Sequence, residues 1–343
     1  MTTPTPPTPS EEGFRTAARS DFPPRLARPL VRGEAGGRRV TPDAVFRRVC
    51  LSAALAILGL LALLLGQMGY GARLSLGRFG LGFLVARVWD PVAEHFGAAT
   101  FVYGTVVSSL LALALAVPFG VAIAIFLVEV APRWLRGPVG FLVELLAAVP
   151  SIVYGLWGLF VLAPVVREVV APALHATLGF LPAFRGTSHG VGMLTAGMLL
   201  AVMILPFIAA ITRDVLTAVP REQREASLAL GATRWETIWH VVLPYGRAGI
   251  IGGVILALGR ALGETMAVTM VIGNNPQIAA SLFAPGYTMS AVIANEYAEA
   301  SGPLYLAALT EIGLLLFVVT FTVNALARTL IWRMARSSSG SPS

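Results

Sequence analysis

Six long apolar stretches constrain the fold of this chain more than any other feature of its sequence. Each one exceeds the roughly 20 helical residues that are needed to cross the hydrocarbon core of a bilayer. Apolar runs of this length without turn clusters are typical of helices and not of strands. The stretches lie at residues 45–68, 100–128, 139–165, 190–212, 248–272 and 304–327.

The low content of charge supports the same interpretation. Charged residues make up 13% of the chain and hydrophobic residues 56%, whereas a soluble domain is roughly one quarter charged. The mean hydropathy is +0.76. We therefore expect an all-α integral membrane protein with six transmembrane helices.

Residues that bind metals, nucleotides or redox groups are scarce. Cys50 is the only cysteine, which excludes an internal disulfide, and the four histidines lie far apart without ligand spacing. All 25 basic residues are arginines, so the chain lacks the lysine of a Walker A loop. We expect no metal site, no catalytic residue and no cofactor bound by this chain.

The distribution of arginines predicts how the chain is oriented in the membrane. The connections near 131–137, 213–247 and 328–343 are rich in arginine, whereas the connection at 273–302 contains none. Short loops that carry positive charge stay in the cytoplasm. Both termini are thus expected to be cytoplasmic, and the net charge of +7 is explained by orientation and not by nucleic-acid binding.

The chain divides into segments of different composition. Residues 1–44 are rich in Pro, Thr, Gly and Arg, cannot build a core, and are expected to form a disordered cytoplasmic tail before an uncleaved signal anchor. The first transmembrane helix is expected at 45–69, followed by an extracytoplasmic amphipathic segment at 70–99 that lies along the membrane interface or receives a partner. A membrane core follows at 100–330, with a cytoplasmic loop at 213–247, and a cytoplasmic tail at 331–343.

The loop at 213–247 contains a charged amphipathic segment. Pro220 favours a helix start, and the run 221–230 places Glu222 and Glu225 on wet faces. Gly231 ends this helix, and a second amphipathic piece, 234–242, leads back to the membrane. Two short helices joined at a glycine would make a compact knob, although a helix resting on lipid headgroups has the same pattern.

The spacing within this loop resembles a known motif. Glu225-Ala226-Ser227 is followed after three residues by Gly231 and, after nine more, by Val241-Val242-Leu243-Pro244. This resembles the EAA loop of binding-protein-dependent ABC importer permeases, with Ser and Val as mild departures from the family pattern. The resemblance implies a type I importer fold and a coupling helix that sits in a cleft of a partner ATPase, which uses ATP and Mg. The residues implied in coupling are Glu222, Glu225, Ala226, Ser227, Gly231, Leu243 and Pro244.

Two charged residues interrupt the fifth apolar stretch. Arg260 lies near its middle, and Glu264 is expected one turn further on the same helix face, at i and i+4. Ionised side chains are costly in hydrocarbon, so both should face the bundle interior or water. They form either a buried ion pair that locks helices or a charge on a substrate path, because a guanidinium offers donors suited to oxyanions.

Two motifs narrow the resemblance. The runs 259–268 (GRALGETMAV) and 144–158 (ELLAAVPSIVYGLWG) resemble the PstC-type permease subunits of phosphate-specific ABC importers, and the similarity covers residues from about 100 to the C-terminus. This implies a non-catalytic, multi-pass subunit in the bacterial plasma membrane. Its implied partners are a PstA-like second permease, a PstB-like ATPase dimer, a PstS-like extracytoplasmic phosphate-binding protein and membrane lipid.

Several alternatives remain open from the sequence. Sulfate and molybdate permeases share the Arg-any-Leu-Gly-Glu core, so another oxyanion is the second hypothesis, and a membrane receptor or scaffold that docks through the same loop is the third. Pro118 and Pro150 interrupt the second and third stretches, either as packing kinks or by freeing backbone groups toward the path. Glu311 is a further intramembrane acid without a partner identifiable from the sequence.

Overall fold

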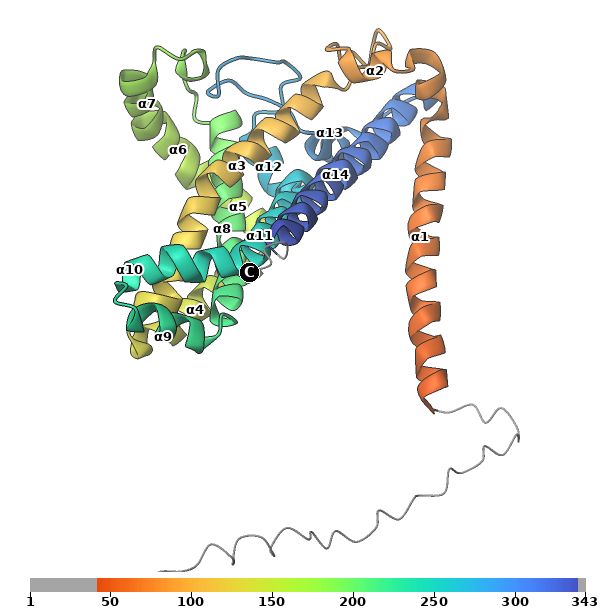
Figure 1. Cartoon of the computed structure of the whole chain (residues 1–343). Coiled ribbons are helices and arrows are strands. Elements are labelled where there is room, and N and C mark those ends of the chain that lie inside the picture. Colours follow the sequence, from red (N-terminus) through yellow and green to blue (C-terminus); the bar gives the residue numbers. More distant parts are fainter. Residues whose placement is uncertain (1–41, 339–343) are drawn as a thin grey trace, which may run out of the picture. The chain divides into compact units, whose positions relative to one another are not determined.

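The computed structural model describes residues 42–338. The regular secondary structure of that part is helical, apart from one isolated β-bridge between Asp90 and His95. Six of the described helical segments are long and apolar enough to cross a membrane (Figure 1). The all-α prediction is confirmed. The tail expected at 1–44 lies almost wholly outside the described residues, and so does the chain end at 339–343.

The six candidate spans are built from long helices or from helices joined by wide π turns. They are α1 (Pro42–Phe79), α3 (Ala99–Ile125) with η2 (Phe126–Val130), α5 (Ser151–Trp157) to α7 (Ala171–Leu178), α8 (Met193–Thr217), α10 (Arg234–Thr237) with η6 (Ile238–Val242) and α11 (Leu243–Gly263), and α14 (Pro303–Ser338).

Shorter elements complete the spans or connect them. They are α2 (Gly82–Val85), α4 (Arg133–Ala148), η3 (Gly158–Leu162), α6 (Ala163–Val165), η4 (Val166–Val170), the 3-10 turn η5 (Pro182–Phe184), α9 (Arg221–Ala229), α12 (Met266–Val271) and α13 (Met289–Glu296).

The first and last helices are longer than the sequence suggested. α1 continues to Phe79, into the segment expected to be extracytoplasmic from residue 70, and α14 continues to Ser338, into the expected tail. Ile57, inside α1, divides the chain into two units, and the second unit contains all the other described helices.

The third span begins later than predicted. It covers Ser151–Leu178 instead of 139–165, and the preceding residues form the separate amphipathic helix α4. The boundary lies at Val149, whose backbone is extended (ψ 131°) because the ring of Pro150 disfavours helical backbone in the residue before it. Pro150 therefore breaks the helix and does not merely kink it.

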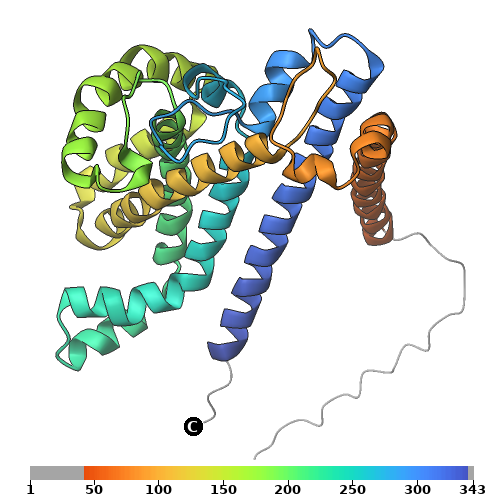
Figure 2. The ribbon, with the colours of Figure 1, turned by 90° about the horizontal axis from the view of Figure 1, so that it is seen from above.

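The fifth span is displaced in the opposite direction, to Arg234–Gly263 instead of 248–272. α11 ends at Gly263 because the backbone of Glu264 is extended (φ −69°, ψ 129°). At its other end, α10, η6 and α11 follow one another without a break through Pro244. Prolines and π turns both bend helices, and the continuous segment bends in this region (Figure 2).

The core is organised around α8, which packs against α3 and α11. Glycines allow the close approach of these helices, as small residues do in membrane bundles. A Cβ atom on Gly120 of α3 would lie 2.9 Å from Ile208 of α8, and one on Gly253 of α11 would lie 2.8 Å from Ile211. α8 is thereby buried on most of its surface.

The second unit has two distinct ends. α4, α9 and α10 gather at one end, and α2, α7 and α13 lie toward the other (Figure 1). The arginine distribution predicts that the end with α9 faces the cytoplasm.

At the opposite end, the carboxylate of Glu296 ties together two segments that are distant in sequence. It accepts hydrogen bonds from Trp89 Nε1 (2.8 Å), from the Tyr305 hydroxyl (2.6 Å) and from the Tyr287 hydroxyl (3.2 Å). Burial raises the pKa of Tyr287 above its ordinary value, so this phenol remains a donor. The loop before α3 is thus held against the segment that leads into α14.

Candidate functional site

The loop predicted as a knob folds as two helices joined by a tight turn. α9 begins directly after Pro220, whose extended backbone (ψ 140°) turns the chain into the helix. Leu230 is its last, half-helical residue, and Gly231 adopts a left-handed conformation with φ +90°. Nothing lies within 4 Å of a Cβ atom built on Gly231, so the backbone conformation and not space requires glycine here.

Both helix ends at this turn are fully capped. The N–H of Ala232 donates to Ser227 O (3.2 Å) and that of Gly231 to Leu228 O (3.0 Å), which is a Schellman ending. Thr233 then starts α10 with a capping box, because the N–H of Thr233 donates to Glu236 Oε2 (2.7 Å) and that of Glu236 to Thr233 Oγ1 (3.3 Å). The turn is therefore a rigid connection and not a flexible loop.

α9 is anchored to the membrane helices by one arginine. Arg224 donates to the carbonyl of Leu216, near the end of α8 (2.6 Å), and pairs with Glu129 in η2 at 3.1 Å. These side chains are only 20% and 18% exposed. On the other side, the hydroxyls of Ser227 and Thr237 lie 3.1 Å apart and join α9 to α10.

The outer surface of α9 is free to meet a partner. Glu222 and Glu225 are exposed on it, as the sequence predicted, and so is Ala226. Leu230 beside the turn is 90% exposed. Leu230 was not among the residues predicted for coupling, although it directly precedes Gly231, which was.

The last two predicted coupling residues lie elsewhere. Leu243 packs with Leu216 and Val242 in a small cluster under the turn, and Pro244 follows it in the first turn of α11. They connect the knob to the membrane helix and do not belong to its outer surface.

Arg260 lies in the last turn of α11 and is exposed. Its guanidinium carbon stands 5.9 Å from the ring centroid of Phe207 in α8. Among the described residues, Arg260 forms no ion pair with Glu264 or with any other acid. A ring contact uses none of the guanidinium N–H donors, so the donors remain available to an anion.

The expected placement of Arg260 and Glu264 on one helix face is wrong, and the ion pair that the sequence left open as one interpretation does not form. Such a pair requires an unbroken helix, and the helix ends at Gly263. Glu264 instead forms hydrogen bonds at the end of the helix. Its carbonyl accepts a hydrogen bond from the hydroxyl of Ser290 (2.7 Å), and its carboxylate accepts one from the N–H of Ala267 at the start of α12 (3.4 Å).

A side chain of this protein also pairs with a backbone carbonyl that the helix break at Pro150 leaves free. The hydroxyl of Tyr154 donates to Leu146 O (2.8 Å), one of the carbonyls at the end of α4. α5 then approaches α12 closely at Gly155, where a Cβ atom would lie 3.1 Å from Ala267 Cα. The third span therefore packs against α12, the short helix that follows the end of α11, and the carbonyl of Leu146 is paired and does not face a path.

Comparisons with known proteins identify the family to which this chain belongs. The sequence model described as "Binding-protein-dependent transport system inner membrane component" matches residues 116–336. The chain belongs to this family. Its loop at 213–247 and its interrupted fifth span both lie inside the matched range, so the family resemblance predicted from the sequence is confirmed.

Relatives within the binding-protein-dependent family are similar over most of the chain. A protein of Mesorhizobium japonicum is 50% identical over 85% of this chain and 90% of its own length. One of Pasteurella multocida is 47% identical over 86% and 93%, and one of Methanocaldococcus jannaschii is 38% identical over 81% and 90%. The first two are named "Phosphate transport system permease protein PstC", and the third carries the same name with "Probable" before it.

Solved structures support the fold alone. A chain from the "Crystal structure of a bacterial ABC transporter involved in the import of the acidic polysaccharide alginate" is similar with a TM-score of 0.54 and 15% identity, over 86% of this chain and 97% of that one. A second alginate transporter structure, in complex with a pentasaccharide-bound periplasmic protein, gives 0.53 and 17% over 89% and 100%. This member of the family therefore has the fold of an ABC importer permease.

Proposed function

We propose that this chain is the permease subunit of an ATP-driven importer of inorganic phosphate in the bacterial plasma membrane. The observation that carries the proposal is the close relationship, over most of the chain, to proteins named as phosphate transport permeases. The geometry supports it, because the chain offers an unpaired arginine at an interrupted membrane helix and a capped knob for a partner.

Arg260 is the residue that we assign to the anion. Its guanidinium stays cationic and presents paired donors that match two oxygens of a phosphate. Since Glu264 is engaged at the helix break, no carboxylate of residues 42–338 pairs with Arg260. Glu264 then belongs to the path as a residue that shapes it, through the backbone of the break, and not as the partner of the arginine.

The continuous helix from α10 to α11 connects the two functional regions. From Arg234 to Arg260 it contains about 40 Å of helix at 1.5 Å per residue. A displacement of α9 by an ATPase is thus transmitted along one element to Arg260. Glu222, Glu225, Ala226 and Leu230 would contact that ATPase, and ATP with Mg would be bound and hydrolysed there and not by this chain.

Further subunits follow from this role. A PstA-like permease would complete the path that this chain half encloses, a PstB-like ATPase dimer would receive α9, and a PstS-like protein would deliver phosphate to the end with α2 and α13. The family description itself names dependence on a binding protein.

The proposal is tested with the importer reconstituted in vesicles. ATP added on the side of α9 should drive uptake of labelled phosphate when the binding protein is present on the other side. Excess sulfate or molybdate should leave uptake unchanged. Uptake of either of those anions in place of phosphate would favour the alternative oxyanion permease, and the absence of any ATP-dependent uptake would favour a receptor or scaffold.

A further inference from the structure

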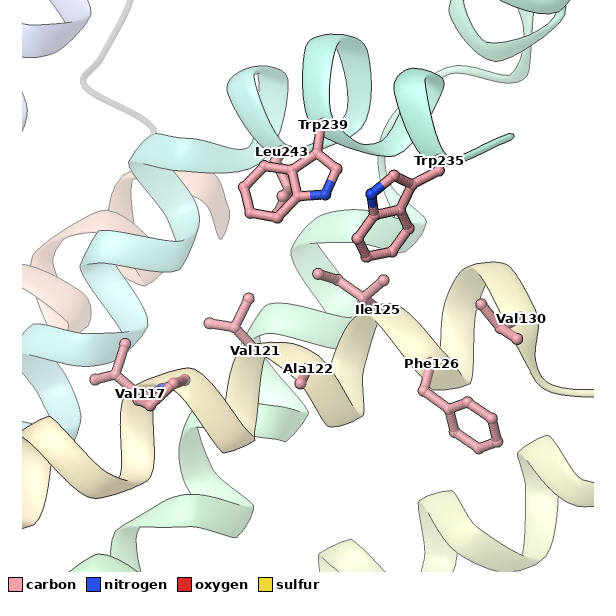
Figure 3. A pocket seen from close by; sticks show the side chains of 10 residues that line it. Val117, Val121, Ala122, Ile125, Phe126, Val130, Trp235, Trp239 and Leu243 are labelled. Carbon is pink, nitrogen blue, oxygen red and sulfur yellow. The ribbon is translucent and has the colours of Figure 1, made fainter. Parts of the chain in front are cut away.

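We propose that the chain carries a binding site for an anionic phospholipid, formed by an apolar groove between α3 and α10–α11 together with a basic pocket at its end. The groove has a volume of about 520 Å³. Trp235, Trp239 and Leu243 project from one side toward Val121 and Ile125 of α3 on the other (Figure 3).

The dimensions of the groove fit an acyl chain. It follows α3 and η2 from Val117 to Val130, which is about 20 Å at 1.5 Å per residue. One leaflet of the hydrocarbon core is about 15 Å thick. Every residue that lines the groove is apolar or aromatic, so the groove offers an acyl chain apolar contact along one full leaflet.

The two indoles mark the level of the membrane surface. Trp235 and Trp239 are 59% and 53% exposed, and their rings meet edge to face with centroids 5.9 Å apart. Tryptophan side chains favour the headgroup level of a bilayer. The end of the groove at Trp235 therefore lies where a headgroup would be.

A basic pocket of about 440 Å³ begins at the same end and shares Val130 with the groove. It is lined by Arg136, Arg224 and Arg234 against one acid, Glu129. Glu129 neutralises Arg224, whereas Arg136 and Arg234 are exposed and form no ion pair within the described part of the chain.

Two uncompensated arginines beside an acyl-chain groove select for a lipid with net negative charge. Basic pockets at the cytoplasmic ends of membrane helices bind anionic headgroups in this way. The bound lipid would fill the space between α3 and the helix that carries Arg260, next to the ion pair that anchors α9. Its chemical class is an anionic glycerophospholipid of the cytoplasmic leaflet.

The test uses the two indoles as reporters in the reconstituted importer. Vesicles of phosphatidylcholine receive increasing fractions of brominated phosphatidylglycerol or brominated phosphatidylcholine, whose bromine atoms quench indole emission. The signal of Trp235 and Trp239 is the difference from a W235F/W239F variant. We expect phosphatidylglycerol to quench this signal at a several-fold lower fraction than phosphatidylcholine.

Four variants make the result specific. R136Q and R234Q should each lower the preference for phosphatidylglycerol about fivefold, while R221Q, a charge change on exposed α9 outside the pocket, should leave it intact. A122F places a ring in the groove from an exposed position and should abolish quenching by both lipids at this site.

Equal quenching by the two brominated lipids in the unmodified protein would overturn the proposal. Protection of both indoles from either lipid would also overturn it, because the groove would then be covered by the second permease. The measurement does not depend on which anion the importer transports.

Discussion

Gly231 holds the turn between α9 and α10 in a left-handed conformation, with φ +90°, that other residues adopt only with strain. G231A should cost about 1–2 kcal/mol and loosen the knob, so the reconstituted importer should hydrolyse more ATP per phosphate transported. G252A is the matched control, because Gly252 lies inside α11 with nothing within 4 Å of a built Cβ atom and alanine favours a helix interior. Unchanged coupling in G231A would contradict this role of the turn.

Glu311 is a buried carboxyl group, 6% exposed, and its Oε2 atom has no hydrogen-bond partner. Ser75 of α1 is buried too, and its hydroxyl is the one polar side-chain group that interacts with this carboxyl within the described residues. An ionised carboxylate in such surroundings costs several kcal/mol, so the neutral variant E311Q should keep or raise the melting temperature of the purified complex. E311A leaves a cavity and should lower it. A clear loss of stability in E311Q would show instead that the charge itself is required.

Single residues could be predicted from the sequence where their role depends on neighbours within a few positions. Gly231 and the exposed Glu222 and Glu225 follow from helix signals within a few positions. The expected shared helix face of Arg260 and Glu264 was wrong, because the i,i+4 rule assumes an unbroken helix and hydropathy does not reveal a break. The contact of Arg224 with Glu129 joins segments far apart in the chain, and no local pattern predicts it.

Among the elements, α9 depends most on a single anchor, the pair between Arg224 and Glu129. R224M leaves a mostly buried carboxylate unpaired, at a cost of about 1–3 kcal/mol. E129Q leaves Arg224 without its counter-charge, whereas the double variant R224M/E129Q removes both charges. We expect the double variant to recover part of the transport and thermal stability lost in each single variant.

Arg221 provides the control for this cycle, because it is exposed on the same helix. R221M should leave the stability of the complex unchanged. Strictly additive losses in R224M and E129Q would mean that the pair does not couple α9 to η2.

The boundaries of the elements show where sequence reasoning is limited. All six apolar stretches correspond to candidate spans, because length and hydropathy are properties of the sequence itself. The third boundary differs from the prediction because Pro150 favours extended backbone at Val149, and the fifth because the backbone at Glu264 is extended inside an apolar run. The long continuous helix through Pro244 was not expected either, since the π turn that accommodates it has no sequence signal.

On the scale of the whole molecule, the fold separates two tasks and joins them by one helix. The end with α9 presents a rigid, capped surface, and the interrupted spans near Arg260 supply a cation that no acid in the described chain neutralises. Fold and family were predictable because the motif at 225–244 and the run at 259–268 are specific. The free state of Arg260 became evident only from the structure.

The proposed transport mechanism depends on contact between Arg260 and the transported anion. Its direct test is ATP-dependent phosphate uptake by reconstituted importers that carry R260Q, compared with unmodified protein and with R185Q, an exposed arginine outside this region. R260Q removes the charge and keeps a polar side chain at an exposed position, so the complex should assemble and bind its ATPase normally. Phosphate uptake by R260Q should fall at least tenfold while R185Q transports normally. Uptake by R260Q equal to that of the unmodified importer would contradict it.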